Sequence, residues 1–136
     1  MKSGLIAAFV SLVALAACAT SGAAGSANAT VKVAVKEFSL KPAVNEVSAG
    51  KVTFVVRNTG RVDHQLVVLR TKRSAKKLYL ATTGDVFEIG RIGKTTPIDA
   101  GRTKTLTLAL EQGHYSLLCN LPGHYKAGQF ADFTVR

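Results

Sequence analysis

Apolar residues recur along the chain in short runs, separated by turn signals about every eight to twelve residues. β-Branched residues are common in these runs, which is typical of strands. The pattern predicts main strands at 31–38, 52–58, 62–70, 104–110, 114–119 and 129–135, with short edge strands near 44–47, 78–80 and 86–89. Only 74–80 is compatible with a turn or two of helix. We therefore expect an all-β fold, a Greek-key β-sandwich or barrel of about seven or eight strands.

The first residues break this pattern. Lys2 precedes an apolar run at 5–17 that is short for a membrane span, which predicts a secretory signal peptide over 1–17. The run ends in the letters LAAC at 15–18, which resemble the bacterial lipobox, so Cys18 is expected to be lipidated and to tether the protein to a membrane. The alternative is an Ala-rich cleavage region with a chance cysteine. Small uncharged residues predict a flexible linker over 18–29, and the folded domain occupies 30–136.

The cysteine count constrains the chemistry of the domain. Cys119 is the only cysteine besides Cys18, so a disulfide within the domain is excluded. An exported protein works in an oxidising compartment, where an exposed lone thiol is a liability. We therefore expect an exported, periplasmic or cell-surface protein in which Cys119 is buried or bound to a ligand.

The formal charge of the chain is +10, and five basic residues fall within 70–77. A basic cluster of this kind can meet nucleic acid, anionic lipid or an acidic protein. Export and the lack of interleaved aromatic residues argue against nucleic acid. The cluster is then either a solvated loop or a docking patch.

Side-chain parity directs three polar residues toward the interior. Side chains of a strand alternate between its two faces, and one inward face is defined by Leu106, Leu108 and Leu110. By the same test His64, Cys119 and Gln129 share the parity of apolar neighbours and lie at strand ends. His114 has the opposite parity from Cys119 and is expected to face outward.

These three residues and His124 make four potential metal donors. A buried polar group costs free energy unless it has a partner, and one metal ion would satisfy all four. Two imidazoles, a thiolate and a weak fourth ligand are typical of electron-transfer copper. Cys119 ends a strand, the turn at 121–123 folds back, and His124 follows at the same point, whereas His64 comes from a distant strand.

Other kinds of site compete with this interpretation. Zinc could use the same donors, although structural zinc sites more often contain paired cysteines, which are absent here. A Cys–His nucleophile would need an orienting carboxylate or a helix N-terminus near Cys119, and the sequence indicates neither. A multicopper enzyme would need more than three histidines. Copper carriage or storage remains as the alternative to electron transfer, although carriers favour Met- or His-rich sites.

The stretch GHYSLLCNLPGHYKAG at 113–128 follows the form G-x-Y-x-x-x-C-N-x-P-G-H-x-x-x-G. It resembles the ligand loop of the cupredoxins, the small blue copper proteins, in its sulfocyanin- and rusticyanin-like form. The resemblance covers 31–136 and is weakest at 70–100, which looks like an insertion. It implies one type 1 copper ion held by His64, Cys119 and His124. Gln129 stands where the family usually has Met, as in stellacyanin-like proteins, which implies an axial amide ligand and a lower reduction potential.

The expected function is that of a monomeric, membrane-tethered blue copper protein, not an enzyme, that carries single electrons between redox protein partners outside the cytoplasm. His124 is expected to be the solvent-facing ligand and electron exit. Asn120 is expected to brace the loop against the strand of His64. A docking patch is expected around Leu121, Pro122, Tyr125 and Ala127.

Overall fold

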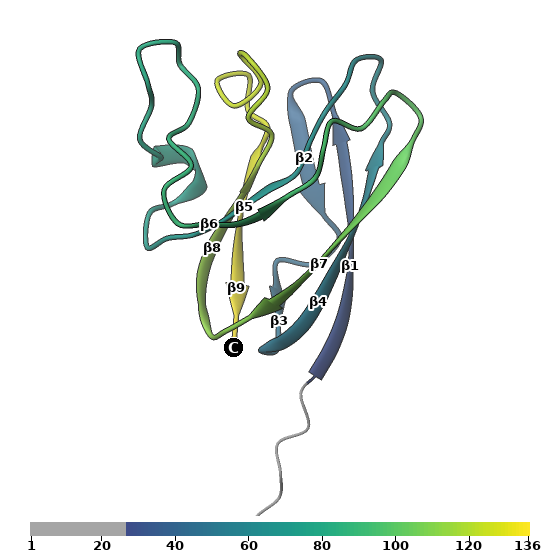
Figure 1. Ribbon diagram of the computed structural model, residues 1–136, viewed down its shortest axis with the longest axis vertical. Coiled ribbons are helices and arrows are strands. Elements are labelled where there is room, and N and C mark those ends of the chain that lie inside the picture. Colours follow the sequence, from purple (N-terminus) through teal and green to yellow (C-terminus); the bar gives the residue numbers. More distant parts are fainter. Residues whose placement is uncertain (1–26) are drawn as a thin grey trace, which may run out of the picture.

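The computed structural model describes residues 27–136, which form nine strands in two packed β-sheets and one short 3-10 turn (Figure 1). The strands are β1 Ala27–Lys36, β2 Ser39–Pro42, β3 Glu46–Val47, β4 Gly50–Asn58, β5 Val67–Arg70, β6 Arg91–Lys94, β7 Thr103–Leu110, β8 Gly113–Leu118 and β9 Phe130–Val135, and the turn is η1 Ala75–Lys77. The first sheet has the order β2-β1-β4-β7 and the second β3-β9-β8-β5-β6. Strands β1 and β4 pair in parallel, as do β3 and β9, and the other neighbours pair antiparallel. The all-β prediction is confirmed.

The main core lies between the inner faces of the two sheets. Alternate residues of β1 and β4 supply one side of it, and Phe54 of β4 meets Phe133 of β9 edge to face, with ring centroids 5.5 Å apart. Burying a side chain of this size stabilises the fold by roughly 1.5–3 kcal/mol. Leu110 is buried and the leucines at 106 and 108 pack against the same core, which confirms the inward face expected for this strand.

The observed strands differ from the predicted ones in four ways. The edge strands expected at 78–80 and 86–89 are reduced to one isolated bridge between Leu80 and Val86. Strand β1 begins at Ala27, inside the segment expected to be linker, because it pairs with β4 from Gly50 onward. The strand expected at 62–70 is regular only in β5, and His64 instead forms an isolated bridge with Ile98. Strands β2 and β6 were not predicted, since each has four residues and depends on pairing with a neighbouring strand.

Two predictions concern residues outside the described range. The signal peptide at 1–17 and the lipidation of Cys18 both lie before residue 27 and stay predictions. Within 27–136, no helix has the length and apolar character needed to cross a membrane.

A second, smaller core fastens the segment after β5 to the outer side of the second sheet. It contains Val67 and Leu69 of β5, Leu118 of β8, and two residues from loops, Val86 and Tyr125, with further contacts from Leu78 and Phe130. The segment at 71–90 is therefore packed onto the domain and is not a free loop, and it reaches the loop that follows Cys119.

Candidate metal centre

The position of His64 is set by its backbone and by a buried asparagine. The His64 N–H donates to the carbonyl oxygen of Ile98 at 3.2 Å, and the Ile98 N–H donates back at 2.7 Å. Asn58 donates from Nδ2 to the carbonyl oxygens of Val62 and Ile98, both at 2.7 Å. These bonds hold the 59–63 loop at the end of β4 and direct the fully buried imidazole into the sandwich.

Cys119, His124 and Gln129 come from the two ends and the middle of one loop between β8 and β9. The Cys119 N–H donates to the carbonyl oxygen of Gln129 at 3.0 Å, which closes the loop at its base. The His124 N–H donates to the carbonyl oxygen of Leu121 at 2.9 Å, across a turn in which Gly123 has a φ of 79°. Glycine adopts this left-handed conformation without strain, so the turn returns His124 to the side of Cys119.

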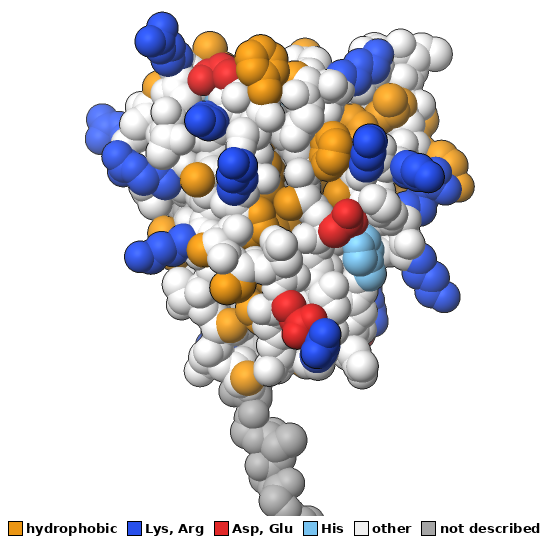
Figure 2. Space-filling view, turned by 180° about the vertical axis from the view of Figure 1, so that it is seen from behind, with side chains coloured by type: hydrophobic (Ala, Val, Ile, Leu, Met, Phe, Trp, Pro, Cys, Tyr) orange, Lys and Arg blue, Asp and Glu red, His pale blue; other side chains and the backbone are white. Residues whose placement is uncertain are grey.

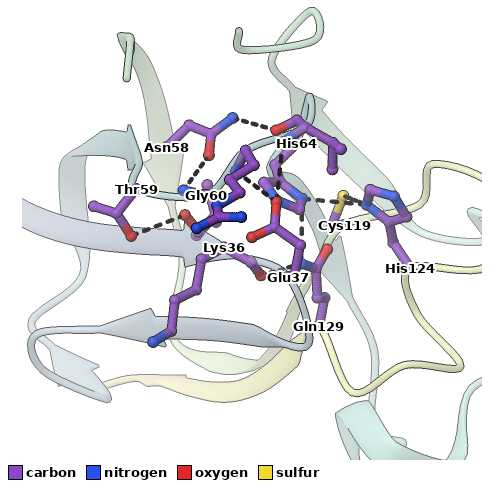
Figure 3. Close-up of polar contacts among 12 residues, drawn as sticks. Lys36, Glu37, Asn58, Thr59, Gly60, His64, Cys119, His124 and Gln129 are labelled. Atoms are coloured by element: carbon purple, nitrogen blue, oxygen red, sulfur yellow. Dashed lines mark hydrogen bonds and ion pairs between the residues drawn. The ribbon is translucent and has the colours of Figure 1, made fainter. Parts of the chain in front are cut away.

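The donor atoms of His64, Cys119 and His124 converge at one point, within 4.8 Å of one another (Figure 3). The Cys119 Sγ lies 3.3 Å from Nδ1 of His124, and the Nδ1 atoms of the two histidines are 3.2 Å apart. His64 and Cys119 are fully buried and His124 is partly exposed. The structure thus brings together the three expected equatorial ligands in a position to hold one metal ion.

Gln129 lies at the same point, and its amide fits a fourth donor. The side chain is 1 % exposed and points toward His64 and Cys119 (Figure 3). Its Nε2 donates to the carbonyl oxygen of Lys36 and lies 3.2 Å from Nδ1 of His64, whereas its Oε1 has no hydrogen-bond partner. A buried amide oxygen without a partner is costly. A metal ion among the three converging donors would offer this oxygen a partner, so the residues present fit the metal that the sequence implies.

Without a metal ion, burial favours the neutral forms of the Cys119 thiol and the His124 imidazole. Burial raises the pKa of the Cys119 thiol, although hydrogen bonds from the backbone of Leu121 and Gln65 oppose the shift. Burial, followed by the nearby imidazole of His64, lowers the pKa of His124. The imidazole of His124 is therefore neutral near pH 7 with a lone pair to donate, and a metal ion must displace the thiol proton of Cys119.

Glu37 supports His64 from behind and was missed by the sequence interpretation. Its Oε1 lies 3.3 Å from Nε2 of His64 and accepts hydrogen bonds from the N–H groups of Arg61 at 2.7 Å and Val62 at 3.0 Å. A carboxylate on the second ring nitrogen fixes the tautomer and orientation of a metal-binding histidine. The alternation of side chains could have identified Glu37, because it has the same parity as the inward-facing Val33 and Val35.

Glu37 also predicts a pH dependence of stability. Hydrogen bonds from the backbone of Arg61, then of Val62, lower its pKa from 4.5 to about 2. A lowered pKa means that the carboxylate stabilises the fold above pH 4.5 and loses this effect as the pH falls toward 2. We expect the unfolding free energy of the metal-free domain, measured by urea titration, to fall more steeply over this range in the wild type than in Glu37→Gln. Parallel curves would contradict this role.

The expected role of Asn120 and the expected exposure of Tyr125 are both wrong. Asn120 does not reach the strand of His64. Its Oδ1 accepts from the Val86 N–H at 2.8 Å, and its Nδ2 donates to the Val86 carbonyl oxygen at 3.0 Å and to Glu88 at 3.1 Å. Tyr125 is 6 % exposed, because its ring packs in the second core and its hydroxyl donates to the carbonyl oxygen of Ala75 at 2.7 Å. Both residues join the loop at 119–129, here named the metal loop, to the segment at 71–90, here named the inserted segment. The path of that segment could not be inferred from the sequence alone.

Asn120→Ala is expected to lower the unfolding free energy by about 1–3 kcal/mol, since each of the two hydrogen bonds lost to the Val86 backbone contributes roughly 0.5–1.5 kcal/mol. The measurement is urea unfolding of the metal-free domain, with exposed Asn45→Ala as the matched control. Equal stability of the two variants would show that the contact with Val86 contributes little.

His114 lies outside the cluster, as its parity indicated. Its Nδ1 faces the carbonyl oxygen of Thr71 at 2.7 Å and its Nε2 faces Asp132 at 2.9 Å. Asp132 also accepts from the N–H of Ala75 at 2.7 Å. His114 therefore helps to hold the segment before η1 against the second sheet.

Two packed sheets with buried imidazole and thiol donors at one end define a small metal-binding β-sandwich protein. Residues 7–131 match the model of the family described as the cupredoxin-like domain, and the chain belongs to this family. Comparison with curated protein sequences finds no match.

Solved structures of the same fold include three that extend over most of this chain. Reduced auracyanin from Roseiflexus castenholzii is 21 % identical, with a TM-score of 0.59 over 82 % of this chain and 99 % of its own. Auracyanin A of Chloroflexus aurantiacus, described as a "blue" copper protein, is 18 % identical, with a TM-score of 0.59 over 81 % and 100 %. Rusticyanin from Thiobacillus ferrooxidans is 17 % identical, with a TM-score of 0.59 over 79 % and 77 %. At these identities the likeness shows the fold.

Proposed function

We propose that the protein is a one-electron carrier that holds one copper ion between His64, Cys119 and His124. The observation that carries the proposal is the convergence of two imidazole nitrogens and a thiol sulfur within 4.8 Å at one end of a cupredoxin-like domain. This donor set is typical of electron-transfer copper. When bound, copper supplies a reversible one-electron couple between Cu(II) and Cu(I). Auracyanin A, a "blue" copper protein of the same fold, supports this choice of metal.

The chain holds its donors in place without the metal, which suits electron transfer. His64 is fixed by Ile98 on its backbone and by Glu37 on its second ring nitrogen. The Cys119 Sγ accepts a hydrogen bond from the Gln65 N–H at 3.3 Å. Donors that are held in this way move little when the charge of the site changes, and little reorganisation favours fast electron exchange. We further propose Gln129 as the axial ligand, on the basis of its unpartnered buried oxygen.

His124 is the proposed point of electron exit. It is partly exposed, whereas His64 and Cys119 are buried. Pro122 is exposed, and Leu121 and Ala127 are partly exposed in the same loop, which supports an apolar rim near the imidazole. With Tyr125 buried, the expected docking patch is reduced to these three residues.

We also propose that the carrier works outside the cytoplasm, tethered through Cys18. The letters LAAC at 15–18 and the lone Cys119 support this location. Labelling of the full-length protein with a radioactive fatty acid, compared with Cys18→Ser, tests the tether. Equal labelling of the two proteins would refute it.

The test of the proposed function uses the domain at 27–136, produced without the N-terminal segment and here named the soluble domain, loaded with Cu(II). We expect an intense visible band from thiolate-to-copper charge transfer and a reversible one-electron wave in solution voltammetry. A colourless protein, or a zinc-loaded form that resists copper, would refute the assignment. Rapid transfer of the ion to a chelator would instead favour the alternative of copper carriage or storage.

A further inference from the structure

The inserted segment between β5 and β6 presents an exposed apolar hairpin. Leu80 bridges Val86, and the Phe87 N–H donates to the Tyr79 carbonyl oxygen at 2.9 Å, so residues 79–89, here named the side hairpin, fold back on themselves. Eight large hydrophobic side chains are exposed among the described residues, and four lie on this hairpin: Tyr79 at 56 %, Leu80 at 40 %, Phe87 at 53 % and Ile89 at 67 %. Exposed large apolar side chains that gather on one short segment are typical of an interaction site.

The geometry of the hairpin separates a packing face from an exposed face. Paired residues of a hairpin project to the same side and successive residues to opposite sides. Val86 is buried in the second core, and its bridge partner Leu80 projects to the same side, whereas Tyr79, Phe87 and Ile89 face outward. The guanidinium of Arg73 lies 4.0 Å from the ring centroid of Tyr79, which holds that ring in place. The Tyr79 ring is thus held by a contact of its own, although more than half of its surface is exposed.

The surroundings of the side hairpin are strongly cationic. Residues 70–94 contain seven Lys or Arg against Asp85 and Glu88, a net +5 of the chain's +10. Glu88 pairs with Arg91 and Lys94, so its charge is largely matched. Figure 2 shows hydrophobic side chains interleaved with Lys and Arg at the upper right, where the hairpin lies after the half-turn from Figure 1. Complementarity then calls for a partner with carboxylates around an apolar contact.

The side hairpin is joined directly to the metal loop. Asn120, which follows Cys119, exchanges two hydrogen bonds with the backbone of Val86 at 2.8 and 3.0 Å. The Leu78 N–H donates to the hydroxyl of Tyr125 at 3.1 Å. A short path therefore runs from the sulfur through one peptide unit and one hydrogen-bonded side chain to the backbone of Val86, next to Phe87.

We propose that the side hairpin is the docking surface for an electron-transfer protein whose contact face is apolar with a carboxylate rim. This inference rests on the proposed function. One electron is exchanged: the partner loses it as the copper site gains it, or the reverse, and no bond or proton moves. This surface is distinct from the surface around His124. It serves as a second site of electron exchange, next to Cys119.

The position of the hairpin favours a protein over a lipid surface. Strand β1 enters at the lower end of the sandwich in Figure 1, whereas the metal loop and the side hairpin lie at the upper end. A tether before residue 27 would thus attach at the end away from the hairpin. The hairpin would then be remote from the point of attachment, where a diffusing protein partner can reach it.

The test uses a surface of defined chemistry as the probe. Gold carrying a mixed monolayer of carboxylate- and methyl-ended thiols imitates the proposed partner face, and amine-ended thiols imitate a mismatched one. Adsorption of the soluble domain, with and without copper, is followed by surface plasmon resonance. The electron-exchange rate of the copper-loaded domain is followed by voltammetry on the same surface.

Phe87→Ser combined with Ile89→Ser is expected to weaken adsorption on the mixed monolayer about tenfold or more, as loss of interface anchors does. Val44→Ser, at an exposed position outside the side hairpin, is the apolar control and should adsorb as the wild type does. Lys76→Glu with Lys77→Glu should also weaken adsorption. Lys32→Glu with Lys51→Glu makes the same charge change on the first sheet and should have a much smaller effect. The visible spectrum and the solution potential should stay unchanged in all four.

Several outcomes would overturn the proposal. One is equal adsorption of the hairpin variants and the wild type, or an equal loss in the controls. Another is binding to vesicles of phosphatidylglycerol and phosphatidylcholine that the hairpin substitutions abolish, which would assign the surface to lipid. Concentration-dependent dimerisation lost in the same variants would assign it to a second copy of the chain. Adsorption is also measured without copper. The docking proposal can therefore be tested even if the proposed copper site proves wrong.

Discussion

Cys119→Ser is expected to abolish the visible band of the copper-loaded domain and to weaken Cu(II) binding by more than about a hundredfold. The loss should exceed the roughly 10–100-fold that follows removal of an outer partner of a ligand, because the substitution removes a ligand itself. Serine keeps the size of the side chain but offers a hydroxyl with no low-energy charge transfer to copper. The site is buried, so a replacement ligand from solvent has little access. Absorption spectra and competition with a chelator of known affinity provide the measurement.

A matched control separates this effect from a general disturbance of the fold. His114→Ala removes an imidazole that bonds Thr71 and Asp132 outside the cluster, and should leave the visible band intact. His124→Ala should reduce or change the band, because this imidazole lies 3.3 Å from the Cys119 sulfur. If Cys119→Ser kept an intense visible band, or if His114→Ala lost it, the assignment of the ligands would be wrong.

Gln129→Met is expected to raise the reduction potential by more than about 60 mV, which for one electron is about a tenfold change in the Cu(I)/Cu(II) equilibrium. An amide oxygen is a harder donor than a thioether and stabilises Cu(II), so its replacement should favour Cu(I). The side chain is almost fully buried, and its Oε1, which could bind the metal, has no hydrogen-bond partner. Protein voltammetry at fixed pH gives the potential directly.

Gln129→Leu helps to interpret this result. It removes the amide and supplies no donor, so it should also raise the potential, while both variants lose the hydrogen bond to Lys36. An unchanged or lower potential in Gln129→Met would mean that the amide does not act on copper and only ties the loop to β1. Urea unfolding of both metal-free variants would then report the contribution of that tie.

Much of the site was predictable because strand parity depends only on local geometry. Parity directed His64, Cys119 and Gln129 inward, and the structure places all three, with His124, around one point. The same rule applied to Glu37 would have identified a carboxylate that continues the inward face of β1 just beyond its last residue. That residue was overlooked because its apolar neighbours made the strand look like ordinary core.

The predictions that were wrong, and the contacts that were not predicted, involve segments that are far apart in the sequence. Asn120 pairs with Val86, 34 residues away, and Tyr125 is covered by a segment 50 residues before it. The strand of His64 is interrupted because Asn58 binds two carbonyl groups, one of them that of Ile98. Strand β2 follows a tight turn in which Phe38 has a φ of 65°, a conformation that its side chain does not reveal in the sequence. Each case is a tertiary constraint that overrides the local pattern.

The bonds of Asn120 and Tyr125 to the inserted segment also have a consequence for protein engineering. A ligand loop is usually treated as a part that can be exchanged between related scaffolds while the rest stays in place. Here the loop at 119–129 and the segment at 71–90 share a core and hydrogen bonds, so the loop alone is an incomplete part. A graft that carries only the loop would leave the Asn120 amide and the Tyr125 hydroxyl without partners. Transplanting both segments together would keep the arrangement in which the donors are held.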